Sequence, residues 1–218
     1  MRILFLDHTA ALGGAELYLL DLAPAFAPPG EVVLFEEGLF TAKLRAASIP
    51  VAVIAAPRAL HRVARESGLA ASLGAAPSLV GLAWRVAQKA RAFDVIYANS
   101  QKALVVGSLA ALLARRPLVW NLHDLLTTEH FSQLNIRIAV TLANRFVRLV
   151  IANSEATKEA FLRAGGRRPV VVVHNGIDVS RFTTVDPERL RALRRELRLG
   201  EGPVVGLFSR LAPWKGQH

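Results

Sequence analysis

The sequence predicts an α/β protein built on a doubly wound parallel sheet. Three observations lead to this prediction. Short apolar runs rich in β-branched residues alternate with helical stretches along most of the chain. These runs lack the polar–apolar alternation of half-exposed strands, which indicates strands covered on both faces. Polar residues gather directly after the runs, as they do at the binding edge of such sheets. A Rossmann-like sheet with right-handed crossovers follows.

The predicted elements follow one another in the order strand, helix, strand. Seven runs are short and apolar, and they predict strands at Ile3–Leu6, Val32–Phe35, Val51–Ala55, Val95–Ala98, Leu118–Asn121, Leu149–Ala152 and Val170–Val173. The longer stretches between them predict helices at Ala15–Phe26, Leu39–Ala47, Ser78–Arg91, Lys102–Ala114, Gln133–Val147 and Glu155–Ala164. One more helix follows, with Asp186 as its N-cap and Pro187 at its first position.

The chain divides into one complete domain and a fragment of a second. We expect an N-terminal domain at residues 1–178, a linker and helix at 179–202, and the first strand and loop of a second domain at 203–218. The strand of this fragment is the apolar run Val204–Phe208. Pro57–Pro77 favours no strand, so a mobile loop over the site, short helices there and disorder all remain open.

Composition narrows the class of protein. With 218 residues, of which 52% are hydrophobic and 20% charged, the chain can bury a full core. It has no cysteine, which excludes disulfides, thiol catalysis and cysteine-bound metal. The start resembles no signal peptide. The longest small-apolar stretch, Ala103–Ala114, is shorter than the roughly 20 residues of a membrane span. We therefore expect a cytoplasmic protein.

The formal net charge of +10 predicts an anionic partner. No zinc-finger, homeodomain or RNA-binding signature is present, so we expect no nucleic acid. Phosphorylated substrates and an anionic membrane surface both stay open. Much of the excess charge lies on two predicted helices, Ile136–Arg148 and Glu188–Leu199. Contact of these basic helices with lipid would place the protein peripherally at the inner membrane face.

Two glycines open the first predicted helix. Gly13 and Gly14 let the backbone approach a ligand and leave amides at a helix N-terminus for an anion. Glu16 lies in the first turn and is placed to face the same site. Glu36, about twenty residues further on, has the spacing of a ribose-binding acid in a dinucleotide fold. However, the loop lacks the first and third glycines of that motif, so we rank nicotinamide binding low.

Polar residues follow the later strands as well. His123 ends a strand at the binding edge, where an imidazole can donate a hydrogen bond to a sugar hydroxyl or stabilise developing charge. Asp124 either orients that ring or caps the next helix. Ser154 reads mainly as a helix N-cap, and Asn175-Gly176 as a tight turn with positive φ at the crossover between domains. The histidines show no metal-binding spacing, so we expect no metal.

The chain ends in a basic loop. Ser209-Arg210-Leu211-Ala212-Pro213-Trp214-Lys215-Gly216 follows the predicted strand Val204–Phe208. An arginine fork and a lysine point charge together suit a diphosphate.

These stretches together resemble family-4 glycosyltransferases of the GT-B architecture, which has two Rossmann-like domains. The matching stretches occur in the family's order and are Gly13–Glu16, His123–Asp124, Asn153–Ser154, Asn175–Asp178 and Arg210–Gly216. The resemblance implies an N-terminal domain plus the start of a C-terminal one. It also implies transfer of a sugar from a nucleotide-diphosphate donor to the hydroxyl of a glycan or lipid-linked acceptor, usually with retention. No cofactor or essential metal is implied.

The resemblance also implies roles for individual residues. We expect a catalytic role for His123 at the transferred sugar, donor-phosphate binding by Gly13, Gly14, Arg210 and Lys215, and substrate binding by Glu16, Asp124 and Asn175. The two cations would stabilise the leaving diphosphate by neutralising its charge. Ser209 departs from the family's usual glycine, which leaves the cations in place.

The paired glutamates of the family's second domain have no counterpart here. We therefore expect this chain alone to transfer sugar weakly or not at all, and a longer reading frame or a partner subunit to supply the missing half. Two alternatives remain. One is a non-catalytic half-protein that binds an anionic sugar or lipid, and the other is a different GT-B enzyme, such as a nucleotide-sugar epimerase.

Overall fold

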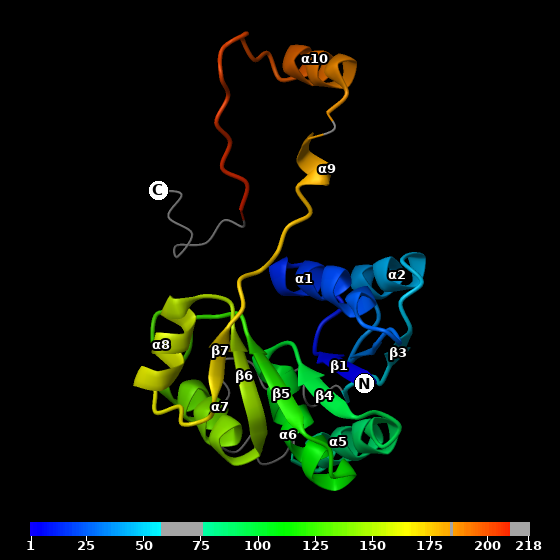
Figure 1. Cartoon of the computed structure of the whole chain (residues 1–218), viewed down its shortest axis with the longest axis vertical. Coiled ribbons are helices and arrows are strands. Elements are labelled where there is room, and N and C mark those ends of the chain that lie inside the picture. The colour runs from blue at the N-terminus through cyan, green and yellow to red at the C-terminus, as the bar shows by residue number, and fades with distance from the viewer. Residues whose placement is uncertain (58–75, 184, 210–218) are drawn as a thin grey trace. The chain divides into compact units, whose positions relative to one another are not determined.

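The computed structural model of the chain describes residues 1–57, 76–183 and 185–209. Within these ranges the chain forms a seven-stranded sheet in which every neighbouring pair is parallel, in the order β3-β2-β1-β4-β5-β6-β7 (Figure 1). The strands are β1 Ile3–Asp7, β2 Glu31–Leu34, β3 Val51–Val53, β4 Val95–Ala98, β5 Leu118–Leu122, β6 Val147–Ala152 and β7 Val170–Val172. The predicted doubly wound, Rossmann-like α/β fold is confirmed.

Helices connect the strands close to the predicted bounds. They are α1 Gly14–Leu22, followed by the 3-10 turn η1 Ala23–Ala25, then α2 Leu39–Ala46, α5 Ala76–Ala90, α6 Gln101–Ala114, α7 Gln133–Phe146, α8 Glu155–Arg163, α9 Ser180–Thr183 and α10 Pro187–Glu196. Ser100, Ser132 and Ser154 cap α6, α7 and α8 by accepting a hydrogen bond from a backbone N–H in the first turn. The predicted N-cap at Ser154 is therefore confirmed.

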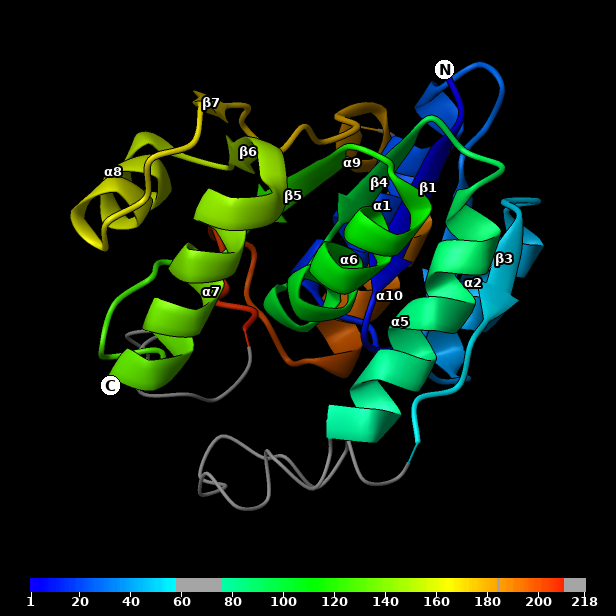
Figure 2. The same cartoon turned by 90° about the horizontal axis from the view of Figure 1, so that it is seen from below.

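Two cores lie on opposite faces of the sheet. On one face, α1 and α2 bury Leu19, Phe40 and Leu44 against Phe5 of β1. On the other face, α5, α6 and α7 lie side by side, as Figure 2 shows. Because central strands are buried on both faces, they favour continuous apolar runs, and β1 and β4 are buried throughout, with Asp7 at the end of β1 as the one charged residue of the two strands.

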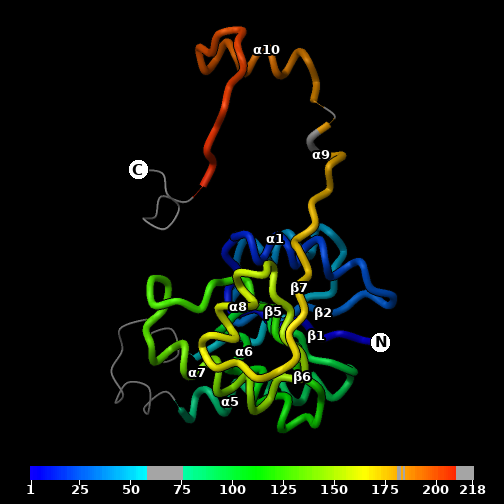
Figure 3. The backbone as a smooth tube through the Cα atoms, turned by 60° about the vertical axis from the view of Figure 1, so that its left-hand side comes forward, coloured from blue at the N-terminus to red at the C-terminus, as the bar shows by residue number. Residues whose placement is uncertain are grey.

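Helix α6 packs close to the sheet because the residues facing the sheet are small. A Cβ at Gly107 would lie 3.3 Å from Leu118 Cδ1 and 3.4 Å from Leu6 Cδ1. Beyond α6, Trp120 of β5 packs edge-on against Phe161 of α8, with ring centroids 6.1 Å apart. The backbone trace in Figure 3 follows the chain through α8 to the edge strand β7.

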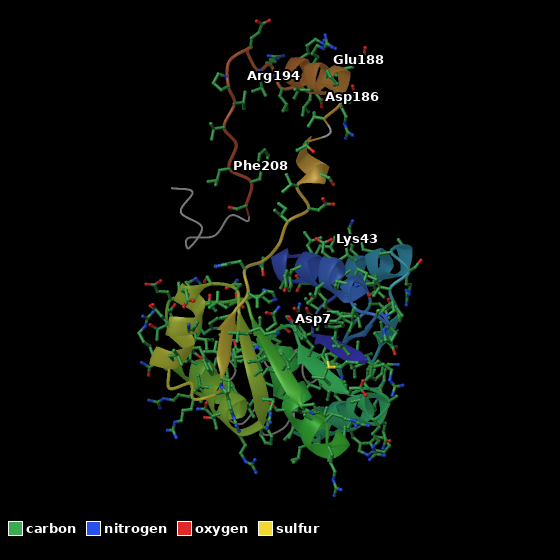
Figure 4. All side chains as sticks on the ribbon, in the orientation of Figure 1. Asp7, Lys43, Asp186, Glu188, Arg194 and Phe208 are labelled. Atoms are coloured by element: carbon green, nitrogen blue, oxygen red, sulfur yellow. The ribbon has the colours of Figure 1, made fainter. Side chains whose placement is uncertain are left out.

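The chain separates into two compact units, Met1–Asn175 and Gly176–His218. In the second unit, Asp186 caps α10 as predicted, and its carboxylate accepts a hydrogen bond of 2.9 Å from Glu188 N (Figure 4). Arg194 of the same helix donates to the carbonyl oxygens of Gly200 and Gly202. Every residue of α10 is exposed except Arg194, which is half-buried.

Two local predictions are wrong. Val204–Phe208 forms no strand, and the side chains of Val205 and Phe208 are 97% and 96% exposed. An apolar run becomes a strand only when neighbouring strands supply hydrogen bonds and cover its faces, and the described residues offer this run neither. Asn175-Gly176 forms no tight turn, and neither residue has positive φ, although the boundary between the two compact units falls between them. Of the segment Pro57–Pro77, residues 58–75 lie outside the described residues.

Candidate functional site

The candidate site lies at the carboxyl edge of the sheet, where the strand order reverses. Helices α1 and α2 carry the chain from β1 to β2 and β3, and the later strands extend from β4 in the opposite direction. The loops after β1 and β4 therefore diverge, which leaves room for a ligand between them. Asp7 ends β1, Asn99 follows β4, and His123 follows β5 at this edge.

Asp7 is the buried carboxylate around which the site is built. It is fully buried, and it lies between the sheet and α1 (Figure 4). Its Oδ1 accepts a hydrogen bond from the backbone N–H of His8 at 2.6 Å and lies 3.2 Å from His8 Nδ1. Its Oδ2 accepts from Asn99 Nδ2 at 2.7 Å. A buried carboxylate needs such donors on both oxygens, and this one has them.

Asn99 joins Asp7 to the next strands. Its Nδ2 donates to Asp7 and, at 3.1 Å, to the carbonyl oxygen of Ala15 at the start of α1. Because both partners only accept hydrogen bonds, the orientation of the Asn99 amide follows from its contacts. Its Oδ1 is therefore turned toward β5, where it lies 3.3 Å from Asn121 Nδ2 and 3.0 Å from His123 Nε2.

His123 presents one edge of its ring to the protein. Nε2 lies between Asn99 Oδ1 and Asn121 Nδ2, which is 2.8 Å away. The Tyr18 ring packs edge-on against the imidazole with centroids 5.5 Å apart. Burial lowers the pKa of His123 below its ordinary value, against the opposing effects of the Asp124 and Asp7 charges. The ring is thus held neutral at pH 7, with Nδ1 left without a partner among the described residues.

The loop after β6 holds the backbone of His123. Asn153 Nδ2 donates to the His123 carbonyl oxygen at 2.9 Å, and Thr157 Oγ1 donates to Asn153 Oδ1 at 2.8 Å. Ser154, the N-cap of α8, lies 3.0 Å from the same threonine hydroxyl. Three consecutive strand ends of the sheet therefore contribute to the position of one imidazole.

Gly13 and Glu16 form the start of α1. A Cβ at Gly13 would lie 2.6 Å from Glu16 Oε2, so a side chain there would displace the carboxylate. Burial, and then the charge of Asp7, raise the pKa of Glu16 above its ordinary value, while hydrogen bonding to the backbone at the start of α1 and the charge of His8 act against this rise. Gly14, exposed at the first helical position, is the glycine open to a ligand.

Glu36 has a structural partner rather than the open position of a ribose-binding acid. Its Oε1 accepts from Thr9 Oγ1 at 2.8 Å and from the Ala10 backbone N–H at 3.0 Å. These bonds tie the loop after β1 to the end of β2. Because its carboxylate is used in this way, Glu36 gives no support to nicotinamide binding, which the missing glycines already made an unfavoured interpretation.

The remaining predicted residues lie outside this network. Asp124 is exposed and caps no helix, because α7 begins nine residues later behind its own cap Ser132. Asn175 is exposed at the end of the first unit. Arg210 and Lys215 lie outside the described residues. No cluster of metal-binding side chains occurs in the part of the chain that the structure describes.

The sequence interpretation missed Asp7, Asn99 and Asn121 as site residues. Asp7 and Asn121 stand at the ends of predicted strands, and Asn99 opens a loop. The available signal was their burial beside apolar strand ends, since an acid or amide there needs a partner. That partner lies far along the chain, and Asp7 and Asn99 are 92 residues apart.

The family of this chain follows from comparison with known proteins. The model of Glycosyltransferase Family 4 matches residues 12–181, and the chain belongs to this family. Its structure is that of the N-terminal half of a GT-B glycosyltransferase. No helix among the described residues combines the length and apolar character that crossing a membrane requires.

Among solved structures, the chain is similar to HepE from Anabaena in complex with UDP-glucose. The two share 46% sequence identity with a TM-score of 0.84, over 100% of this chain and 55% of HepE. A glycosyltransferase from Rickettsia africae shares the fold, with 15% identity and a TM-score of 0.71. The match covers 99% of this chain and 54% of the Rickettsia protein. The chain thus spans about half the length of these proteins. No protein with a curated description matches it.

Proposed function

We propose that the protein transfers a hexose from a UDP-linked donor to an acceptor hydroxyl with retention, and that this chain supplies the acceptor side of the cleft. The observation that carries the proposal is the 46% identity with HepE along the whole chain, since HepE was solved with UDP-glucose. UDP-glucose is accordingly the first donor to test.

Each of the candidate residues has a separate role in the proposed reaction. His123 forms a hydrogen bond with the transferred sugar through Nδ1, the ring nitrogen that its protein contacts leave unused. The exposed Gly14 amide, at the N-terminus of α1, faces the donor phosphates, with Gly13 shaping the turn. Arg210 and Lys215 neutralise the leaving diphosphate, which lowers the barrier without a protein nucleophile. Since these cations carry that charge, the proposal needs no metal and no cofactor.

Glu16, Asp124 and Asn175 remain candidates for binding substrate hydroxyls. Burial and the charge of Asp7 raise the pKa of Glu16, and the charge of His8 opposes them, which supports a place for Glu16 near these two residues. Asp124 follows His123 directly and is exposed. Asn175 is exposed at the boundary of the second unit.

We also propose a glycan or lipid-linked acceptor presented at an anionic membrane surface. Helix α7 supports this, because Leu134 and Ile138 are exposed beside the exposed Arg137 and Arg145. Such a face combines apolar contact with attraction to anionic lipid. Cosedimentation with phosphatidylglycerol vesicles, and none with phosphatidylcholine vesicles, tests the proposal. Binding to neither, or equally to both, would contradict it.

The enzymatic proposal is tested with the protein read from its full reading frame. UDP release from UDP-glucose should collapse in Lys215→Ala and persist in Lys43→Ala, which removes an exposed lysine on α2. The 218-residue chain alone should release little or no UDP. If Lys215→Ala retains turnover, the diphosphate role is wrong. If acceptor binding occurs without turnover of any nucleotide sugar, the protein is a non-catalytic binding module.

A further inference from the structure

His8 is held by the same carboxylate that supports His123. Asp7 Oδ1 lies 3.2 Å from His8 Nδ1, and Ser100 Oγ lies 2.9 Å from that nitrogen on the other side. A carboxylate oxygen offers only lone pairs, so this contact is favourable only when Nδ1 carries a hydrogen. Ser100 Oγ already accepts from the Ala103 N–H and can share the same Nδ1–H. The neutral ring then has its lone pair on Nε2.

The outward side of His8 is accessible. Its side chain is 31% exposed, and among the described residues Nε2 has no partner. His8 follows β1 at the point where the strand order reverses, on the same sheet edge as His123. Its free nitrogen is therefore a hydrogen-bond acceptor at the candidate site.

His123 is reached from the same carboxylate through Asn99. Asp7 Oδ2 accepts from Asn99 Nδ2, which turns Asn99 Oδ1 toward β5, where it lies 3.0 Å from His123 Nε2. Asn121 Nδ2 lies 2.8 Å from the same ring nitrogen. An accepting oxygen and a donating amide thus both face Nε2, so the geometry fixes the tautomer of His8 and not that of His123.

We propose that Asp7 is a positioning residue that fixes His8 with its hydrogen on Nδ1 and a lone pair at Nε2. Resting on the proposed function, His8 Nε2 accepts a hydrogen bond from the hydroxyl of the acceptor substrate. The buried carboxylate that joins the His123 network through Asn99 thus also orders a hydrogen-bond acceptor at the same site.

The other charged groups nearby define the conditions of the test. Glu16 interacts electrostatically with Asp7 and His8, and Asp124 and Asp7 interact with His123. Tyr18 packs on the His123 ring. The tautomers are therefore to be measured at about pH 8, where histidine is neutral.

The test is long-range ¹H–¹⁵N NMR of the ¹⁵N-labelled 218-residue chain, with the two rings assigned from His8→Gln and His123→Gln. We expect the Nδ1–H tautomer for His8. Asp7→Ala removes both accepting oxygens, so the Ser100 hydroxyl, 2.9 Å from Nδ1, can donate to that nitrogen and should shift the ring toward the Nε2–H tautomer. Asp94→Ala is the matched control, since that exposed carboxylate accepts the Arg2 N–H at 2.6 Å and should leave the His8 ring unchanged.

An Nε2–H tautomer of His8 in the wild-type chain would overturn the inference, as would an unchanged His8 ring in a folded Asp7→Ala. Should Asp7→Ala fail to fold, the wild-type spectrum still decides. With the full-length protein and UDP-glucose, His8→Gln should raise KM for the acceptor substrate up to about tenfold and leave KM for UDP-glucose unchanged. A rise in the donor KM alone would refute the role of His8. Failure with every donor would refute the proposed function, while the NMR result would still decide the role of Asp7.

Discussion

Replacing Asn99 by alanine removes the side chain that joins Asp7 to His123. Asn99 is fully buried, and its amide makes one bond to a carboxylate and one to a backbone carbonyl. A hydrogen bond to a charged group contributes about 1.5–3 kcal/mol, and one to a neutral carbonyl about 0.5–1.5 kcal/mol. We therefore expect Asn99→Ala to lower the free energy of unfolding by about 3 kcal/mol, or the melting temperature by about 6–12 °C for a chain of this size.

The assay is thermal and urea unfolding of the 218-residue chain, followed by circular dichroism at pH 7. Asn144→Ala is the matched control, because its amide also bonds to Gly165 O at 2.9 Å and Arg167 N at 2.7 Å, but in an exposed setting. Water can replace those exposed hydrogen bonds, so Asn144→Ala should lower the free energy of unfolding by less than about 1 kcal/mol. A loss in Asn99→Ala no larger than in the control would refute the reasoning.

Three further predictions concern pH and packing. Folding raises the pKa of Glu16, so the free energy of unfolding of the protein should fall as pH rises above 4.5, the ordinary pKa of this group. In urea titrations, Glu16→Gln should therefore gain stability relative to wild type between about pH 4 and pH 7. No relative gain over this range would contradict the direction of the pKa shift. Burial lowers the pKa of His123, so the free energy of unfolding should fall as pH drops below 6.5, the ordinary pKa of histidine. His123→Gln should lose this part of the pH dependence. Parallel stability–pH profiles of wild type and His123→Gln would refute the prediction. Gly81→Ala should stabilise the protein by about 1 kcal/mol, because alanine favours the helix α5 and its Cβ would meet open space. Gly107→Ala on α6 should stabilise it less, because its Cβ would lie 3.3 Å from Leu118. Equal gains in thermal melts would contradict the packing argument.

The sheet could be predicted from the sequence because its determinants are local. Each buried strand needs an uninterrupted apolar run, and the predicted strand Val95–Ala98 matches β4 at both ends. The Val204–Phe208 run has the same local character but forms no strand, because strand formation also requires neighbours. Periodicity therefore identifies a segment suited to a sheet, while the hydrogen-bond partners decide whether one forms.

The site could be predicted only in part. His123 is conspicuous as a polar residue after an apolar strand, and the rule for parallel sheets places it at the binding edge. The network that orients it depends on Asp7 meeting Asn99 across 92 residues, which no local pattern encodes. Likewise, the close approach of Glu16 to Gly13 follows from how the side chain folds back at the start of α1. Residue type thus indicated the class of chemistry, and tertiary contacts determined the geometry.

Incubation of the full-length protein with UDP-glucose and a panel of glycan and lipid-linked acceptors, followed by mass spectrometry, tests the central claim most directly. The account predicts that UDP appears together with a glucosylated acceptor, that the product retains the anomeric configuration of the donor, and that both UDP and product are lost in His123→Ala. Unchanged UDP-glucose with every acceptor would contradict the account. An epimerised sugar, or free sugar formed while no acceptor is consumed, would contradict it as well.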